Sequence, residues 1–187
     1  MFQSPQTAEN LTWHENKRIR DDKLRHPADS PAWQLIDKKS PDFARELRNL
    51  QLALSSNGIN PYSTLTTTYN CWSVALIIYN LPPWLCMERK FMTLFVLISE
   101  HKQPGNDIDV CLAPLIEDLK TLWDVGVNVF DAYKKQTFIL HVVLIKTISD
   151  FPTYGNLHGY TVKGYYDCPV CGTSTCACWL PHSRKMS

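Results

Sequence analysis

The sequence has almost no net charge and no long apolar run. Nineteen lysines and arginines face eighteen aspartates and glutamates, which leaves a formal charge of +1 on 187 residues. A domain that simply coats nucleic acid is usually far more basic. The most apolar windows, Trp72–Met87 and Phe138–Ile148, are interrupted before they reach the ~20 residues that a membrane span requires. The polar start of the chain also lacks the apolar core of a signal peptide. These absences predict a soluble intracellular protein with no membrane contact.

The sequence also lacks the even number of cysteines that a fully disulfide-bonded protein would have. Three of the seven cysteines stand alone, and the other four fall within eleven residues near the end of the chain: Cys168, Cys171, Cys176 and Cys178. An odd number without a secretory signal disfavours a disulfide framework and favours buried thiols together with a candidate metal cluster.

The composition is that of a globular domain, with 44% hydrophobic and 20% charged residues, and it excludes wholesale disorder. Residues 1–47 are polar and rich in proline, and we expect an irregular extension that is too poor in large apolar groups to form a core of its own. Apolar residues spaced for one helix face predict short helices at Pro31–Asp37 and Pro41–Leu47.

The next segment has the patterns of three strands and a helix. Alternating leucines over Leu50–Leu54 predict a strand that ends in a turn at Ser56–Gly58, and β-rich runs at Leu65–Leu81 and Phe91–Ile98 predict two more. Apolar residues at helical spacing then predict a helix capped by Asp107 and ended by Gly126. Pro114 either begins its regular part or kinks its first turns.

Two further strands are predicted at Val127–Asp131 and Thr137–Ile148. Three sequential strands, a crossover helix and a long buried strand form the opening of a ribonuclease-H-like fold. We therefore expect an α/β protein with an incomplete RNase-H-like core over residues 48–160 and a Cys-rich tail over 161–187. Four tryptophans are expected to be core or half-buried anchors: Trp33, Trp72, Trp84 and Trp123.

Several strings, in this order, resemble the transposase of plant CACTA (En/Spm-like) DNA transposons, over about Thr12 to Lys185. The strings that carry the resemblance are Leu24–Trp33, Arg48–Leu54, Tyr79–Met87, Pro104–Val110, Ile148–Leu157 and Cys168–Cys171. The resemblance implies a DDE/D enzyme of the nucleus that cuts and joins DNA at transposon ends. In such an enzyme three acids hold two divalent metals, usually Mg²⁺.

Carried over residue by residue, the family pattern has one match and one mismatch. Asp150 falls where the second acid belongs, at the end of the long strand, and would be a Mg²⁺ ligand. Asn57 stands in the place of the first acid, and its uncharged amide should hold Mg²⁺ poorly. The resemblance also implies that the third acid would lie beyond Ser187 and that the family continues past both ends. We therefore expect a catalytically inactive partial transposase.

These residues also have plainer interpretations. Without the family, Asp150 is a strand-end acid beside the Pro152 turn, and Asn57 is an ordinary residue of an Asn-Gly turn. The acids of the predicted helix are expected to be a helix cap and a solvated face.

The tail has the spacing of half a zinc knuckle at Cys168 and Cys171, because two thiolates on a tight turn can face one tetrahedral ion. The remaining ligands would have to come from Cys176, Cys178 and His182, and the alternative is an oxidation-prone thiol cluster with no Zn²⁺.

The loop before the tail contains Tyr154, Tyr160 and Lys163, which could stack bases and contact phosphates, although aromatic residues that cover a sheet edge explain them equally simply. Three hypotheses follow. The chain is an impaired transposase, a DNA-binding or protein-interaction remnant that acts through other transposase chains, or an incomplete fold with no function.

Overall fold

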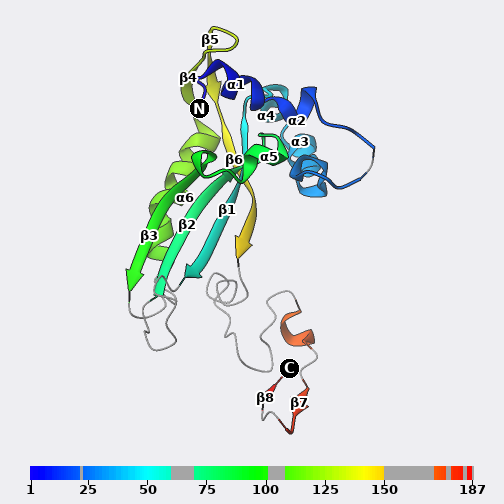
Figure 1. Cartoon of the computed structure of the whole chain (residues 1–187), viewed down its shortest axis with the longest axis vertical. Helices are drawn as coiled ribbons and strands as arrows, with labels where there is room; N and C mark the ends of the chain where they lie inside the picture. Colours follow the sequence, from blue (N-terminus) through cyan, green and yellow to red (C-terminus); the bar gives the residue numbers. More distant parts are fainter. Residues whose placement is uncertain are drawn as a thin grey trace. The chain divides into compact units, whose positions relative to one another are not determined.

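The computed structural model of the chain describes residues 1–21, 23–59, 70–100, 108–149, 171–175, 178–182 and 185–186 (Figure 1). The chain divides into two compact units. The first comprises Met1–Ser55, Ala75–Phe95 and Pro114–Ile148, and the second comprises Ser56–Val74, Val96–Ala113 and Ser149–Ser187.

Short helices dominate the beginning of the chain: α1 (Pro5–Asn10), α2 (Trp13–Asn16), η1 (Pro27–Asp29), α3 (Pro31–Lys39) and α4 (Pro41–Arg45). Local signals explain their starts. The Ser30 hydroxyl accepts the Trp33 N–H and Pro31 occupies the first turn of α3, as is typical of helix starts. The two short helices predicted near residues 31 and 41 are confirmed as α3 and α4.

The main sheet is mixed and has the strand order β3-β2-β1-β6. Its strands are β1 (Leu50–Ile59), β2 (Asn70–Ile78), β3 (Met92–Glu100) and β6 (Val142–Ser149). The N–H of Leu50 donates to the carbonyl of His141, so β1 and β6 begin side by side and run parallel. The N–H of Tyr79, just after β2, donates to the carbonyl of Gln51, so β2 runs antiparallel to β1. Between β2 and β3 lie two short turns of helix, α5 (Pro83–Cys86) and η2 (Arg89–Phe91).

Helix α6 (Ile108–Asp124) connects β3 to a hairpin of β4 (Val127–Asp131) and β5 (Gln136–Leu140), after which the chain enters β6. Pro114 lies inside α6, so the alternative in which the regular helix begins there is wrong. Gly126 ends the helix at φ +72°, a left-handed conformation that glycine adopts without strain, and its N–H donates to the Thr121 carbonyl.

The long strand predicted over Thr137–Ile148 is divided at His141 into β5 and β6. Buried asparagine side chains explain the division. The His141 N–H donates to Asn49 Oδ1 at 2.8 Å, and the Asn80 amide bridges the Asn49 carbonyl and the Gln51 N–H. The three segments are therefore joined through side chains at the point where β6 begins.

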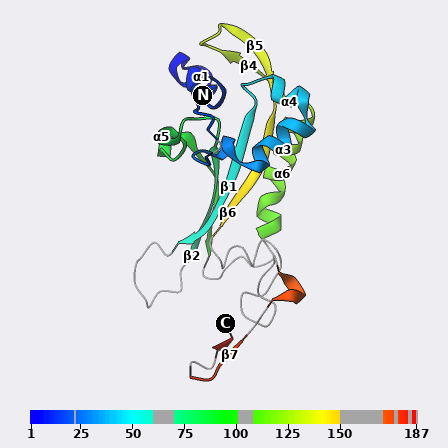
Figure 2. The same ribbon diagram turned by 90° about the vertical axis from the view of Figure 1, so that its right-hand side faces the viewer.

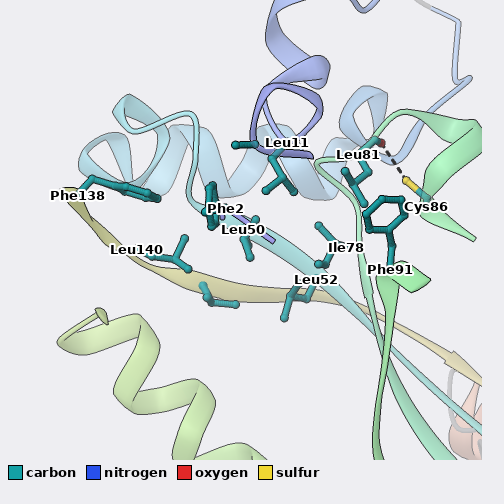
Figure 3. Packing of buried hydrophobic residues seen from close by; sticks show 12 residues of the cluster. Phe2, Leu11, Leu50, Leu52, Ile78, Leu81, Cys86, Phe91, Phe138 and Leu140 are labelled. Atoms are coloured by element: carbon teal, nitrogen blue, oxygen red, sulfur yellow. Dashed lines mark hydrogen bonds between the residues drawn. The ribbon is translucent and has the colours of Figure 1, made fainter. Parts of the chain in front are cut away.

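Apolar side chains from both ends of the first unit share one core (Figure 3). Phe2 packs edge-on against Phe138 with ring centroids 5.2 Å apart, and Leu11 is fully buried among residues of β1 and β2. Figure 2 shows α1 and α5 on one side of β1 and α3 and α4 on the other. A second cluster lies on the α3 side and comprises Ala28, Trp33, Ala53, Ile77 and Tyr79.

The tryptophan prediction is correct for Trp33 and Trp72, whose exposed fractions are 4% and 2%. It is wrong for Trp84 and Trp123, which are 66% and 38% exposed. Trp84 projects from the short α5 and contacts Trp13 edge-on, and Trp123 lies in the last turn of α6 beside Phe43. Each ring therefore contacts one neighbouring ring and leaves the rest of its surface in solvent.

The described part of the tail contains η4 (Gly172–Ser174) and a short hairpin of β7 (Trp179–Leu180) and β8 (Lys185–Met186). Among the helices that the structure describes, none is both long enough and apolar enough to cross a bilayer.

Candidate functional site

The end of β1 is the place where the sequence predicts the first acid. The strand continues through Ile59, so the turn predicted at Ser56–Gly58 is wrong. Side chains alternate along it: Ser56 is fully buried and Asn57 is exposed. Asn57 is therefore a strand residue near the carboxyl end of β1, and its side chain reaches solvent.

Packing against Trp72 explains the glycine that suggested a turn. A Cβ atom on Gly58 would lie 3.1 Å from Cε2 and 3.2 Å from Cζ2 of the Trp72 ring. Trp72 belongs to β2 and is 2% exposed, so its ring has little room to move away. Gly58 permits this close approach, which is a common reason for glycine inside a strand.

Several buried polar atoms of the second unit lack a hydrogen-bond partner among the described residues. They are Ser56 Oγ, Trp72 Nε1 and Ser149 Oγ. Unpaired buried groups of this kind are uncommon in folded proteins, and ordered water or a ligand usually satisfies them. Ser56 and Ser149 come from β1 and β6, which are neighbours in the sheet.

Six of the predicted site residues lie outside the described residues: Asp150, Tyr154, Tyr160, Lys163, Cys168 and Cys176. The described structure ends β6 at Ser149, directly before Asp150. The predicted roles of these residues in binding Mg²⁺, DNA or Zn²⁺ therefore remain predictions.

The residues at the end of β1 do not fit Mg²⁺ as they stand. Mg²⁺ prefers charged oxygen ligands in near-octahedral geometry, and the Asn57 amide offers one uncharged carbonyl oxygen. Within the part of the chain that the structure describes, no group of three or more His, Cys, Asp or Glu side chains could hold a metal ion. No catalytic step through Mg²⁺ can be derived from this arrangement.

The predicted Zn²⁺ ligands that the structure describes are Cys171, Cys178 and His182, and all three are exposed. The carbonyl of Cys171 accepts the Ser174 N–H at the start of η4, Cys178 directly precedes β7, and His182 follows it. This set of ligands is incomplete without Cys168 and Cys176, which lie outside the described residues.

One cysteine–histidine pair does occur in the first unit, at Cys86 and His26. The sulfur lies 3.8 Å from His26 Nε2, and both groups contact the Leu81 carbonyl. Burial raises the pKa of the Cys86 thiol to about 11, so the thiolate needed for nucleophilic attack is scarce at neutral pH. His26 also caps η1 through Nδ1, which accepts the Ala28 N–H. The pair is a structural element of the core.

Comparison with known proteins decides the family. The family model described as "Transposase family tnp2" matches residues 21–187. The chain belongs to the tnp2 transposase family. A search of curated proteins and a search of solved structures each returned no match to the chain. Membership of the tnp2 family supports a transposase-type function and, in general terms, an association with DNA.

Sequence reasoning did not single out Tyr79, Ile145 or Lys146, which line an open pocket of the first unit. No motif marks them, because Arg25–Ser30 and β6 are brought together only by the fold. Strand alternation could have indicated that Ile145 faces the core and that Lys146 does not.

Proposed function

We propose that this chain is an En/Spm-like DNA transposase core of the DDE/D type with a ribonuclease-H-like fold, and that its catalytic metal site is disabled by Asn57. One observation carries the proposal: β6 follows a crossover helix and lies parallel to and beside β1. The order of three sequential strands, a helix and a strand returning next to the first agrees with the order that a ribonuclease-H-like core requires.

The pairing of β1 with β6 supports a shared site at their carboxyl ends. The Leu50 N–H bonds to the His141 carbonyl, which sets Leu50 opposite Val142, and both side chains belong to one core cluster. The same register sets Ala53 opposite Ile145, and these two side chains meet in the other cluster. Counting forward without a bulge sets Asn57 opposite Ser149, the residue that precedes the predicted ligand Asp150 in the chain.

The loss of one charge at this position has a direct consequence. Carboxylates that converge on Mg²⁺ bind through negative oxygens, and an amide of the same shape supplies no charge. Metal-ion catalysis needs the ion to activate the attacking oxygen and to stabilise the leaving one. With Asn57 in the first acid's place, we expect the chain to bind DNA without cutting it. We assign it to the nucleus, because the DNA of a transposon lies there.

A non-catalytic role is the second candidate, and the condition of the first unit favours it. Its core, the side-chain caps of α1, η1 and α3, and the ion pairs of Arg48 with Glu46 and Asp131 are formed. A fold that is retained while the metal site is lost suits a protein that holds DNA or associates with other transposase chains. Tyr154, Tyr160 and Lys163 are the proposed DNA contacts, and Cys168, Cys171, Cys176, Cys178 and His182 the proposed Zn²⁺ ligands.

The test uses a duplex that carries the terminal repeat of the element. The proposal predicts salt-sensitive binding, seen as a linear fall of the logarithm of affinity with the logarithm of salt concentration, and no cleavage in Mg²⁺ or Mn²⁺. Cleavage by the purified chain that disappears in Asp150→Asn would overturn the claim of lost activity. No binding at any salt concentration would overturn the association with DNA.

A further inference from the structure

The first unit carries an open pocket of about 500 Å³ that none of the assignments above uses. Its walls come from the segment before α3, the first turn of α3, the residue after β2 and the middle of β6. The residues that matter for its chemistry are Arg25, Pro27, Pro31, Ala32, Tyr79 and Lys146. This volume lies within the range of about 300–1,000 Å³ that is typical of small-ligand sites.

Much of the pocket lining is apolar. Tyr79 is 7% exposed and belongs to the same core cluster as Trp33, so its ring is a fixed wall. The rings of Pro27 and Pro31 are rigid and lie at the start of η1 and α3. The helix caps at His26 and Ser30 fix the backbone on either side of them. Such a cavity accommodates a planar apolar group better than a flexible chain.

The charges at the pocket are of one sign. Arg25 and Lys146 line it, and its lining residues, as far as the structure describes them, include no acid. Lys146 is exposed and follows Ile145, which packs into the core cluster; because β6 lies at one end of the strand order, the Lys146 side chain can extend round the sheet edge. Among the described residues, no acid lies within ion-pair distance of Lys146.

Arg25 forms an ion pair with Asp21, and the two side chains are 48% and 36% exposed. An exposed pair of this kind contributes little to stability, so an arriving anion can share or replace it at small cost. A neighbouring pocket of similar size differs in that its lining includes the acids Glu15, Asp21, Asp29 and Asp37.

We propose that this pocket binds one nucleotide unit, with the base between Tyr79 and the proline rings and the phosphate at Arg25 and Lys146. An aromatic wall beside two cations is the usual arrangement for a base and its phosphate. The choice of a nucleotide within a DNA single strand, over a free nucleotide, rests on the proposed DNA-binding function. A sugar phosphate without a base would leave the apolar walls unused.

The experiment uses a fluorescein-labelled dT12 strand, free dTMP, inorganic phosphate and a 20-base-pair duplex, each titrated against the whole chain. Ala32→Trp fills the pocket without changing its charge, and Leu35→Trp is the matched control on the exposed surface of the same helix. Lys146→Glu reverses a charge at the pocket, and Lys120→Glu reverses one on the exposed part of α6. Thermal unfolding by circular dichroism shows which variants fold.

The proposal predicts that Ala32→Trp and Lys146→Glu each weaken dT12 binding about tenfold, while Leu35→Trp and Lys120→Glu stay within about twofold of the unchanged chain. An iododeoxyuridine strand should crosslink to the peptide that contains Tyr79, and Ala32→Trp should abolish that crosslink. If Ala32→Trp folds and binds dT12 and dTMP as tightly as Leu35→Trp does, the pocket is not the nucleotide site.

The other outcomes separate this proposal from the proposed function. In one outcome Ala32→Trp still binds the duplex, and dT12 binding is the same in all pocket variants. This outcome overturns the nucleotide site in the pocket and leaves the DNA-binding function standing. Pocket-dependent binding of dTMP with no affinity for either form of DNA supports the nucleotide site and overturns its DNA source together with the DNA-binding function. Binding of phosphate alone, unaffected by Ala32→Trp, overturns the role of the apolar walls.

Discussion

His14 is the most strongly perturbed histidine of the first unit. Burial lowers the pKa of His14 from 6.5 to about 4, although a hydrogen bond with the backbone of Asn80 offsets part of this effect. Its ring packs 5.1 Å from the ring of Trp33, and Nδ1 has no hydrogen-bond partner among the described residues. The folded chain therefore holds His14 neutral, whereas the unfolded chain protonates it near pH 6.5.

This difference predicts a loss of stability in weak acid. As the pH falls from about 6.5 to about 4, His14 binds a proton in the unfolded state but not in the folded state. The free energy of unfolding should therefore drop by about 2–3 kcal/mol. The measurement is urea unfolding at pH 7, 5.5 and 4.5. His14→Gln should flatten this part of the profile, while the exposed His182→Gln should leave it unchanged. Equal slopes in all three proteins would contradict the pKa assignment.

Single residues also mark where sequence reasoning stops. Asn57-Gly58 is a strong turn signal, yet Gly58 serves a contact with Trp72 that lies on another strand and far along the chain. The pattern of one segment contains no information about such a partner. Trp84 and Trp123 were expected to be core or half-buried anchors for a similar reason, since hydrophobicity alone does not show which face of a helix meets a neighbour.

At the scale of elements, a buried ion-pair cluster joins the β4–β5 hairpin to the start of β1. Arg48 pairs with Glu46 at 2.5 Å and with Asp131 at 3.2 Å, and its guanidinium lies 3.8 Å from the centre of the Phe138 ring. Burial raises the pKa of Asp131, but the Lys134 N–H and the Arg48 guanidinium outweigh burial and hold this pKa below its usual value. The charge on Asp131 thus stabilises the fold.

Removing this charge should be costly in a way that an exposed pair is not. We expect Asp131→Asn to lower the free energy of unfolding by about 3 kcal/mol at pH 7, because Arg48 stays buried with one partner fewer. Asp42→Asn, which breaks the exposed pair with Arg45, should leave it unchanged. Chemical unfolding of the two variants measures both. Similar values for them would show that the cluster adds nothing to stability.

Most elements could be predicted because their signals are local. Period-two alternation indicated β1, helical spacing and Gly126 indicated α6, and proline with serine indicated α3. The division of the last strand at His141 could not be predicted, because it depends on Asn49 and Asn80, which lie far away in sequence. The hairpin lengths, the pocket at Tyr79 and the Arg48 cluster likewise depend on long-range packing.

At the scale of the whole molecule, membership of the tnp2 family identifies the class of protein. The proposed loss of catalytic activity rests on the proposed metal site. A strand order of β3-β2-β1-β6, with β6 parallel to β1, brings two carboxyl ends together at one edge of the sheet. Such an edge is where a metal site can be built from strand-end acids, and one of the two positions carries Asn57. The candidate site was inferred from the family's motifs and stays a prediction, whereas no motif indicated the pocket.

The most direct test of the account is Mn²⁺ binding, followed by the paramagnetic resonance signal of the free ion. The account predicts that Asn57→Asp binds Mn²⁺ at least about tenfold more tightly than the unchanged chain, because the predicted site then has two carboxylates, at positions 57 and 150, instead of one. Asn128→Asp, which places the same charge on the exposed face of β4, should not differ from the unchanged chain, and Asp150→Asn should cancel the gain of Asn57→Asp. If Asn57→Asp binds Mn²⁺ no more tightly than Asn128→Asp does, there is no metal site between the ends of β1 and β6, and the account is wrong.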